Sequence, residues 1–404
     1  MSGKSHARIA DLRGASRLAI DATVGLTSLV ETMHHNILRT PGVLGAKTQA
    51  PTNGITGLVY KSIRGATRLV GGGIDAVLRR FAARFDDDAR SSPQRETVLA
   101  VLNGVLGDHL EATSNPLATA MQWRREGRPL QLTRAALQAA MPAAHGKLLL
   151  LVHGLCMNDL RWQRNGHDHG AALAVDAGFT PLYLNYNSGL HVSTNGRALA
   201  RQIESLRQAW PVPLSDVSIL AHSMGGLLAR SACHYGKAEG HGWLSRLSRI
   251  VFLGTPHHGA PLERGGNWID AVLDASPYTT AFARLGKIRS AGITDLRHGS
   301  VLDEDWNRGD RFERSKRKPP VVPLPAGVAC HALAASISDK SVPAARRLIG
   351  DGLVPVDSAL GRHRNPQRDL HVPDDRRWVA HGLHHLDLLD DRAVYERIRL
   401  WLGQ

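Results

Sequence analysis

Apolar residues recur at helical spacing over the first part of the chain. One such stripe runs through residues 26–37 and a second through residues 55–85. Because side chains three and four positions apart lie on one face of an α-helix, each stripe predicts an amphipathic helix. Turn-forming residues at 41–53 separate the two helices. The glycines at 71–73 weaken the second helix, since a glycine costs roughly 1 kcal/mol in a helix interior.

Short apolar runs replace the helical stripes after residue 147. Six of them are typical of buried strands: Leu148–Val152, Thr180–Leu184, Val217–Leu220, Ile250–Leu253, Val328–Ala334 and Arg377–Ala380. Helices are expected at 197–210, 225–235 and 392–402. Strands that alternate with helices favour an α/β fold, with a mostly parallel, doubly wound sheet flanked by helices.

These patterns divide the chain into three segments. We expect a basic helical extension over residues 1–90 and a helical connecting segment over residues 91–146. Residues 147–404 form the predicted α/β domain. An insertion at about 261–325 is long for a connection and carries apolar residues at helical spacing, so it is a candidate lid or a set of ordinary insertion helices.

The charge of the chain is strongly positive and unevenly distributed. With 404 residues, 43% of them hydrophobic, the chain is long and apolar enough for a large core, yet its formal net charge is +14. Residues 1–85 hold twelve Lys or Arg against four acids. No nucleic-acid motif accompanies them, so we expect no nucleic-acid partner. Either these helices form a hairpin packed on the main domain, or they lie on an anionic membrane or lipid surface.

Three further features indicate the compartment. No run approaches the roughly 18 to 20 consecutive apolar residues of a spanning helix. Asp11 and Asp21 interrupt the first thirty residues and no small-residue cleavage site follows, so we expect no secretory signal. Cys156, Cys233 and Cys330 have no metal-site or disulfide-framework spacing. We therefore expect a cytoplasmic protein, with attachment to a membrane left open.

One serine lies where a predicted strand gives way to a predicted helix. The motif Ala221-His222-Ser223-Met224-Gly225-Gly226 directly follows the apolar run that ends at Leu220. A turn that lifts a side chain off a strand end brings neighbouring backbone close, and only Gly or Ala fits two positions before and after the nucleophile. Ala221 and Gly225 occupy these positions. The motif predicts Ser223 as the nucleophile of a serine hydrolase.

A nucleophilic serine needs donors for the oxyanion that forms on its substrate. A predicted strand runs into His153-Gly154-Leu155, a turn that can aim a backbone amide into the pocket. We expect the amides of Leu155 and Met224 to be these donors. An ordinary strand-end turn is the alternative for His153-Gly154.

The serine also needs a base and an acid that orients the base. Asp351 begins a tight turn with glycine and proline after a late strand, and it is the predicted acid. The competing acids are Asp339, Asp357, Asp374 and Asp375. His385 follows the last strand and is the predicted base, with His384 as the alternative. The order Ser, Asp, His is that of the α/β-hydrolase fold.

Five segments in this order resemble bacterial lipases and esterases related to GPI inositol-deacylases. They are His153-Gly154-Leu155, Ala221–Gly226, Gly254–Gly259, Asp351–Pro355 and His385–Leu389. The resemblance covers about residues 147–404 and implies an α/β-hydrolase fold, in which residues 254–259 help to shape the acyl pocket. The candidate substrate-binding residues are His153, Gly154, His222, His257 and His258.

Metal chemistry has little support in the sequence. The motif His167-Asp168-His169 and the pairs His257-His258 and His384-His385 do not repeat the His-Glu-x-x-His arrangement of a zinc hydrolase. We also find no glycine-rich phosphate loop and no dinucleotide fingerprint. We therefore expect neither a metal nor a cofactor.

The sequence predicts a carboxylic-ester hydrolase, a lipase or esterase that works through a Ser-His-Asp triad and an acyl-enzyme. The expected substrate is an acyl ester or a lipid. Acyl transfer or thioester cleavage by the same triad is one alternative. A lipid-surface binding protein with a vestigial hydrolase domain is another.

Overall fold

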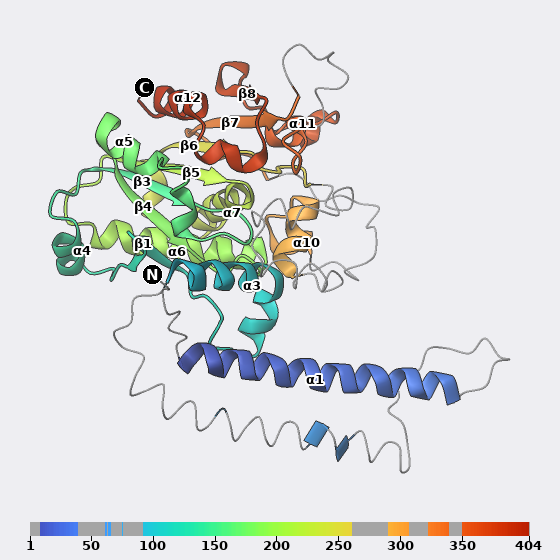
Figure 1. Cartoon of the computed structure of the whole chain (residues 1–404). Helices are drawn as coiled ribbons and strands as arrows, with labels where there is room; N and C mark the ends of the chain where they lie inside the picture. The colour runs from blue at the N-terminus through green and yellow to red at the C-terminus, as the bar shows by residue number, and fades with distance from the viewer. Residues whose placement is uncertain are drawn as a thin grey trace. The chain divides into compact units, whose positions relative to one another are not determined.

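The computed structural model describes residues 9–38, 61–62, 64–65, 75, 92–260, 290–306, 322–338 and 350–403. Figure 1 shows the course of the chain. The chain divides into two compact units, one of Met1–Arg95 with Leu110–Ala118 and one of Glu96–His109 with Thr119–Gln404. Most of the predicted helix at 55–85 and of the insertion at 261–325 lies outside the described residues.

An eight-stranded sheet in the order β2-β1-β4-β3-β5-β6-β7-β8 forms the centre of the larger unit. Its strands are β1 (Gln122–Arg125), β2 (Arg128–Pro129), β3 (Lys147–Val152), β4 (Thr180–Asn185), β5 (Asp216–His222), β6 (Leu247–Leu253), β7 (Ala329–Ser336) and β8 (Arg377–His381). Strands β4, β3, β5, β6, β7 and β8 pair in parallel, and β1 pairs antiparallel with both β2 and β4. The predicted α/β fold with its mostly parallel sheet is confirmed, and all six predicted strands are present.

Helices cover both faces of this sheet (Figure 1). The α-helices are α1 (Ile9–Leu38), α3 (Pro93–Ala112), α4 (Arg134–Ala140), α5 (His169–Ala177), α6 (Val192–Ala209), α7 (Met224–Ala238), α10 (Ala291–His298), α11 (Val356–Ala359) and α12 (Arg392–Gly403). The 3-10 turns are η1 (Asp159–Trp162), η2 (Gly242–Arg246), η4 (Asp303–Asp305), η6 (Pro366–Arg368), η7 (Asp374–Arg376) and η8 (His385–Leu389). Helices α6, α7 and α12 confirm the predicted helices at 197–210, 225–235 and 392–402. None of the described helices combines the length and the apolar character that crossing a bilayer requires.

The sheet is apolar on both faces. For this reason its strands are continuous runs of apolar residues and do not alternate between apolar and polar residues. Leu148, Leu150 and Val152 of β3 pack with α6 and α7, whereas Leu149 and Leu151 belong to the cluster with α5 and α12. Successive side chains point to opposite faces of a strand. A single leucine-rich strand therefore serves two cores.

Residues 122–129, which we expected to be helical, form the hairpin of β1 and β2. Glu126 and Gly127 both have positive φ, at 52° and 73°, as the two central residues of a type I′ hairpin turn require. Trp123 is buried, but the neighbouring arginines are polar, so the pattern of apolar residues does not indicate a strand here. The helical connecting segment predicted for 91–146 is therefore wrong at this hairpin.

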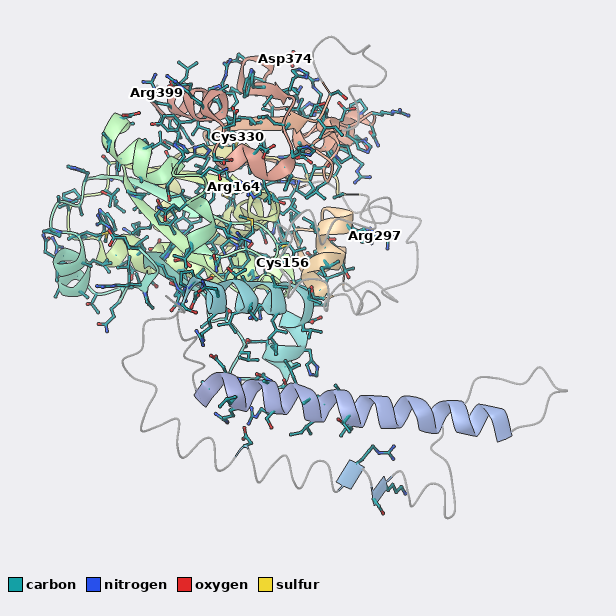
Figure 2. The ribbon with its side chains drawn as sticks, viewed as in Figure 1. Cys156, Arg164, Arg297, Cys330, Asp374 and Arg399 are labelled. Carbon is teal, nitrogen blue, oxygen red and sulfur yellow. The ribbon has the colours of Figure 1, made fainter. Side chains whose placement is uncertain are left out.

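The three cysteines are buried free thiols. Figure 2 labels two of them, Cys156 and Cys330. Burial raises the pKa of both of these thiols to about 12, so they stay protonated at neutral pH. They pack as small apolar residues.

In the smaller unit, α1 carries part of the positive charge and pairs it with an acid distant in sequence. The guanidinium Nε atoms of Arg13 and Arg17 lie 2.6 Å and 2.7 Å from the same carboxylate oxygen of Asp75. The amide of Asn115 also donates to the carbonyl of Gly14, at 3.1 Å. Residues 26–37, predicted as helical, lie within α1.

A buried ion cluster joins α3, β1 and η1 in the larger unit. Nη1 of Arg124 donates to Glu96 at 2.8 Å and to Asp159 at 3.1 Å, and all three residues are at most 9% exposed. Burial raises the pKa of Asp159, and the charge of Arg124 opposes that rise. The guanidinium therefore compensates two carboxylates that water does not solvate.

We expect Arg124→Met to lower the free energy of unfolding by about 3–5 kcal/mol, because it leaves two buried carboxylates without their countercharge. Urea unfolding followed by circular dichroism measures the change. Arg399→Met is the matched control, because the Arg399–Glu396 pair is about half exposed, at 49% and 47%. It should leave the urea midpoint nearly unchanged, and equal effects of the two substitutions would contradict the role of the buried cluster.

Candidate active site

Ser223 occupies a strained turn between β5 and α7. Its φ and ψ angles are 55° and −125°, a region that residues with a side chain rarely adopt. Such a conformation costs about 1–3 kcal/mol and persists only where the surroundings enforce it. Here the backbone amide of Ser223 donates to the carbonyl of Leu253 at 2.8 Å, and the amide of Gly226 donates to the carbonyl of Ser223 at 3.0 Å. The turn is held from both sides.

Two glycines let neighbouring backbone approach this turn. A β-carbon on Gly225 would lie 2.3 Å from the carbonyl oxygen of Val152 and 2.7 Å from that of His153. One on Gly154 would lie 2.9 Å from the β-carbon of Ser223. The start of α7 and the loop after β3 thus pack against each other, and this loop carries Leu155.

The carboxylate of Asp351 is held by three donors. One oxygen accepts the backbone amides of Leu353 and Val354, at 2.9 Å and 2.8 Å. The other accepts Nδ1 of His385 at 2.6 Å, and both side chains are almost fully buried. The amide of His385 also donates to the carbonyl of Asp351, at 3.2 Å. His384 is exposed and lies at the N-cap of η8, so the ring that meets the acid is that of His385.

The pairing with Asp351 fixes the tautomer of His385. With its proton on Nδ1, the neutral ring presents Nε2 as an acceptor. Among the described residues, this buried Nε2 has no hydrogen-bond partner. Ser223 and His385 line the same pocket, and a serine–histidine bond is often long until a substrate is bound. The free acceptor thus belongs to a residue that lines the same pocket as Ser223.

Two backbone amides at this pocket have no acceptor recorded in the described part of the chain. That of Met224 lies in the first turn of α7, where an α-helix offers no internal acceptor and carries partial positive charge. That of Leu155 lies in the turn after β3. The next amide, of Cys156, is already bonded to the hydroxyl of Ser188, at 3.0 Å. Neither of the two amides predicted as oxyanion donors is thus bonded to another group among the described residues.

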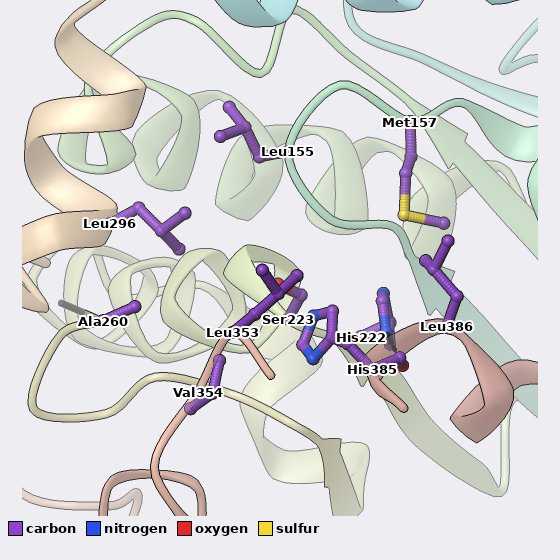
Figure 3. Close-up of a pocket in the computed structure, with 10 residues that line it drawn as sticks. All are labelled: Leu155, Met157, His222, Ser223, Ala260, Leu296, Leu353, Val354, His385 and Leu386. Carbon is purple, nitrogen blue, oxygen red and sulfur yellow. Dashed lines mark hydrogen bonds between the residues drawn. The ribbon is translucent and has the colours of Figure 1, made fainter. Parts of the chain in front are cut away.

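Among the described residues, the lining of the pocket is apolar apart from His222, Ser223 and His385. About 390 Å³ of space, which includes open solvent at its mouth, lies between the lining residues. Its lining residues are Leu155, Met157, His222, Ser223, Ala260, Leu296, Leu353, Val354, His385 and Leu386. Figure 3 shows Ser223, His222 and His385 side by side, with Leu155 and Leu296 on one side and Met157 and Leu386 on the other. Such a lining suits a neutral hydrocarbon group.

Three histidines predicted to bind substrate are not among the described residues that line this pocket. His153 is wholly buried, stacks on Tyr186 at 4.3 Å, and has its pKa lowered to about 4 by burial. His257 is buried edge-on against Phe252, and burial lowers its pKa well below the ordinary value. His258 is half-buried, and burial lowers its pKa to about 4. Of the predicted set, His222 lines the pocket and Gly154 adjoins Ser223.

Several pocket residues were not singled out from the sequence. Leu353, Val354 and Leu386 lie inside motifs that the sequence analysis identified, so the position of these motifs could have placed the three residues at the pocket. Ala260 directly precedes the segment 261–289, and Leu296 lies in α10. Neither has a local signal in the sequence, because an apolar residue at such a position has the same pattern as any core residue.

No group of three or more His, Cys, Asp or Glu side chains among the described residues could hold a metal ion. In the motif His167-Asp168-His169, the two rings bond to each other, at 2.8 Å, and Asp168 caps α5. These side chains thus have structural partners.

The mostly parallel sheet flanked by helices, with Ser223 after β5 and His385 after the last strand, has the α/β-hydrolase fold. Within it, residues 143–323 match the family model described as the PGAP1-like alpha/beta domain. The resemblance expected from the sequence is confirmed.

Solved structures to which this chain is similar include lipases and esterases. The mature lipase of Bacillus licheniformis is 17% identical with a TM-score of 0.42, over 70% of this chain and 98% of the lipase. An esterase of Pyrococcus furiosus is 14% identical with a TM-score of 0.37, over 65% and 81%. Lipase B of Aspergillus fumigatus is 13% identical with a TM-score of 0.36, over 66% and 57%. No curated protein matches the chain in sequence.

We expect Gly225→Ala to lower the free energy of unfolding by about 1–3 kcal/mol, because the new β-carbon collides with the backbone at the end of β3. Thermal unfolding measures this effect. Gly403→Ala is the control, since a β-carbon there meets nothing within 4 Å and alanine favours the helix. If both substitutions raised the melting temperature alike, α7 and the loop after β3 would be packed less closely than described.

Proposed function

We propose that the protein is a carboxylic-ester hydrolase of the lipase or esterase class, with Ser223 as nucleophile, His385 as base and Asp351 as acid. The observation that carries this proposal is the buried bond of 2.6 Å between Nδ1 of His385 and Asp351, in a pocket that also exposes Ser223 on a strained turn. An isolated buried His–Asp pair would be ordinary. Its position after the last strand, next to a serine with positive φ, supports catalysis.

In this mechanism Oγ of Ser223 attacks the ester carbonyl while Nε2 of His385 takes its proton. The resulting imidazolium is stabilised by the Asp351 carboxylate, which keeps its own charge. The amides of Leu155 and Met224 donate to the oxyanion of the tetrahedral intermediate. His385 then protonates the leaving alcohol, and water releases the acyl group from Ser223 by the reverse sequence.

The apolar lining supports an ester or lipid whose acyl group is an uncharged hydrocarbon. Leu155, Leu296, Leu353 and Leu386 present no cation or hydrogen-bond donor from their side chains. Acyl transfer to another alcohol and thioester cleavage require the same reacting groups, so product analysis with competing acceptors distinguishes them from hydrolysis.

We expect Ser223→Ala to lower kcat/KM on a p-nitrophenyl acyl ester series by about four orders of magnitude or more, with an unchanged melting curve. A fluorophosphonate probe should label the wild-type chain at Ser223 and leave the variant unlabelled. His385→Ala should be as inactive as Ser223→Ala, whereas His384→Ala, at an exposed position, is the matched control and should stay active. Ester turnover that survives in Ser223→Ala refutes the assignment, and an unlabelled wild-type chain would favour a vestigial hydrolase domain.

Contact of residues 1–85 with an anionic membrane or lipid surface remains our proposal for the basic extension. Its support is the excess of positive charge in that segment, together with the acyl or lipid substrate proposed above. We expect the full chain to co-sediment with vesicles that contain 30% anionic phospholipid more than with neutral vesicles. Deleting residues 1–85 should abolish the difference, and equal co-sedimentation of the two chains would exclude this contact.

A further inference from the structure

The turn that carries the candidate base is held by two buried histidines from distant parts of the chain. Nε2 of His222, at the end of β5, lies 3.2 Å from the carbonyl oxygen of His385. Nε2 of His169, in the first turn of α5, lies 3.0 Å from the carbonyl oxygen of Leu388. Both rings are completely buried. Two of the backbone carbonyls of η8 therefore bond to side chains of other elements.

A carbonyl accepts hydrogen bonds and donates none, so both histidines carry a proton on Nε2. In a neutral ring Nδ1 is then an acceptor. Nδ1 of His169 lies 2.8 Å from Nε2 of His167, which supplies the proton of that bond. Burial lowers the pKa of His169 to about 4 and that of His222 well below its ordinary value, so both are uncharged at neutral pH. A continuous chain of donors thus runs from His167 through His169 to η8.

The residues just before His169 contact the end of η8 at further points. Arg164 lies 3.4 Å from the carboxylate of Asp390 and 3.8 Å from that of Asp387. The amide of Asn165 donates to Asp390 at 2.5 Å. Residues 164–169, which we call the clasp, therefore bind η8 through its backbone and through its acids.

The residue that follows β6, Gly254, packs closely against the ring of the candidate base. A β-carbon on Gly254 would lie 3.0 Å from Cε1 of His385 and 2.9 Å from Cδ1 of Leu388. The ring of His385 therefore packs against the backbone of Gly254, while its Nδ1 is bonded to Asp351. The two histidines add bonds to the backbone of η8, which the amide of His385 already ties to the carbonyl of Asp351.

We propose that His169, together with His222, is a positioning residue that fixes η8 and thereby sets the distance between Nε2 of His385 and Oγ of Ser223. This inference rests on the function proposed above. It assigns a role to the motif His167-Asp168-His169, which the triad does not use. Misplacement of a reacting group by about 1 Å costs on the order of a hundredfold in rate, so a small shift of η8 has a large effect.

Uncharged donors suit this position. The ring of His222 lies 4.7 Å from that of His385, which must become an imidazolium during the reaction. A lysine or arginine in place of His222 would also donate to the carbonyl, but its charge would oppose protonation of the base. A neutral imidazole holds the backbone without this penalty.

The test compares His169→Leu, which removes the donor, with His169→Gln, whose amide nitrogen takes the place of Nε2. We expect His169→Leu to lower kcat about tenfold to a hundredfold with KM changed by less than about twofold, and His169→Gln to recover most of that loss. The rate of labelling by a fluorophosphonate should fall in parallel with kcat, because it too depends on the base. All assays use the full chain, well below the melting temperature of each variant.

His331→Leu is the matched control. His331 is also a buried histidine, but it lies on β7. Burial lowers its pKa to about 4 as well, yet its ring stacks on Trp401 and has no bond to η8. This substitution should lower the melting temperature and leave kcat within about twofold. If His169→Leu and His169→Gln behaved like His331→Leu, the role of His169 would be only structural and the proposal would fail.

A second variant covers the case in which His169→Leu does not fold. His167→Leu acts at a half-buried position and removes the donor to Nδ1 of His169, so it should lower kcat by about threefold to tenfold without changing KM. An unchanged kcat in this variant overturns the donor chain. Ester turnover that persists in Ser223→Ala refutes the proposed function itself, whereas an inactive Ser223→Ala with fully active His169 variants refutes only the positioning.

Discussion

The parallel pairing of β5 with β3 and β6 is the constraint on which the candidate site depends. In that register Val152 lies opposite Ala221 and Leu253 lies opposite His222, so the three strands end together. The carbonyl of Leu253 is therefore in place to bind the amide of Ser223, and this bond helps to hold the serine in its strained conformation. Because β7 pairs in parallel with β6 and β8 pairs in parallel with β7, the segments with Asp351 and His385 follow strand ends at the same edge of the sheet as Ser223.

Much of this arrangement could be predicted from the sequence because it depends on short-range patterns. Leucine-rich runs give the buried strands, and the Gly and Ala positions around Ser223 give the elbow. The hairpin of β1 and β2 could not be found in this way, since Arg124 is buried through ion pairs with Glu96 and Asp159 rather than through hydrophobicity. Leu296 was missed for a related reason, because only tertiary folding brings its apolar side chain to the pocket.

The histidines illustrate where residue type alone misleads. From the sequence, His153, His257 and the motif His167-Asp168-His169 looked like candidate ligands of a substrate or a metal. In the fold, burial removes the charge of His153, His169 and His257, and their rings serve as packing surfaces or as neutral hydrogen-bonding groups. Only the register of distant segments determines which of the 21 histidines meets an aspartate beside the serine.

The positive charge of the chain follows a similar logic at a larger scale. A count over residues 1–85 treats every Lys and Arg as available to a partner. Arg13 and Arg17 instead share the single carboxylate of Asp75, which cancels one of their two positive charges, and in the larger unit the charge of Arg124 is cancelled by Glu96 and Asp159. An ion pair inside a unit contributes little field beyond a Debye length of about 8 Å. Any attraction to an anionic surface must therefore come from the positive charge that these ion pairs leave uncompensated.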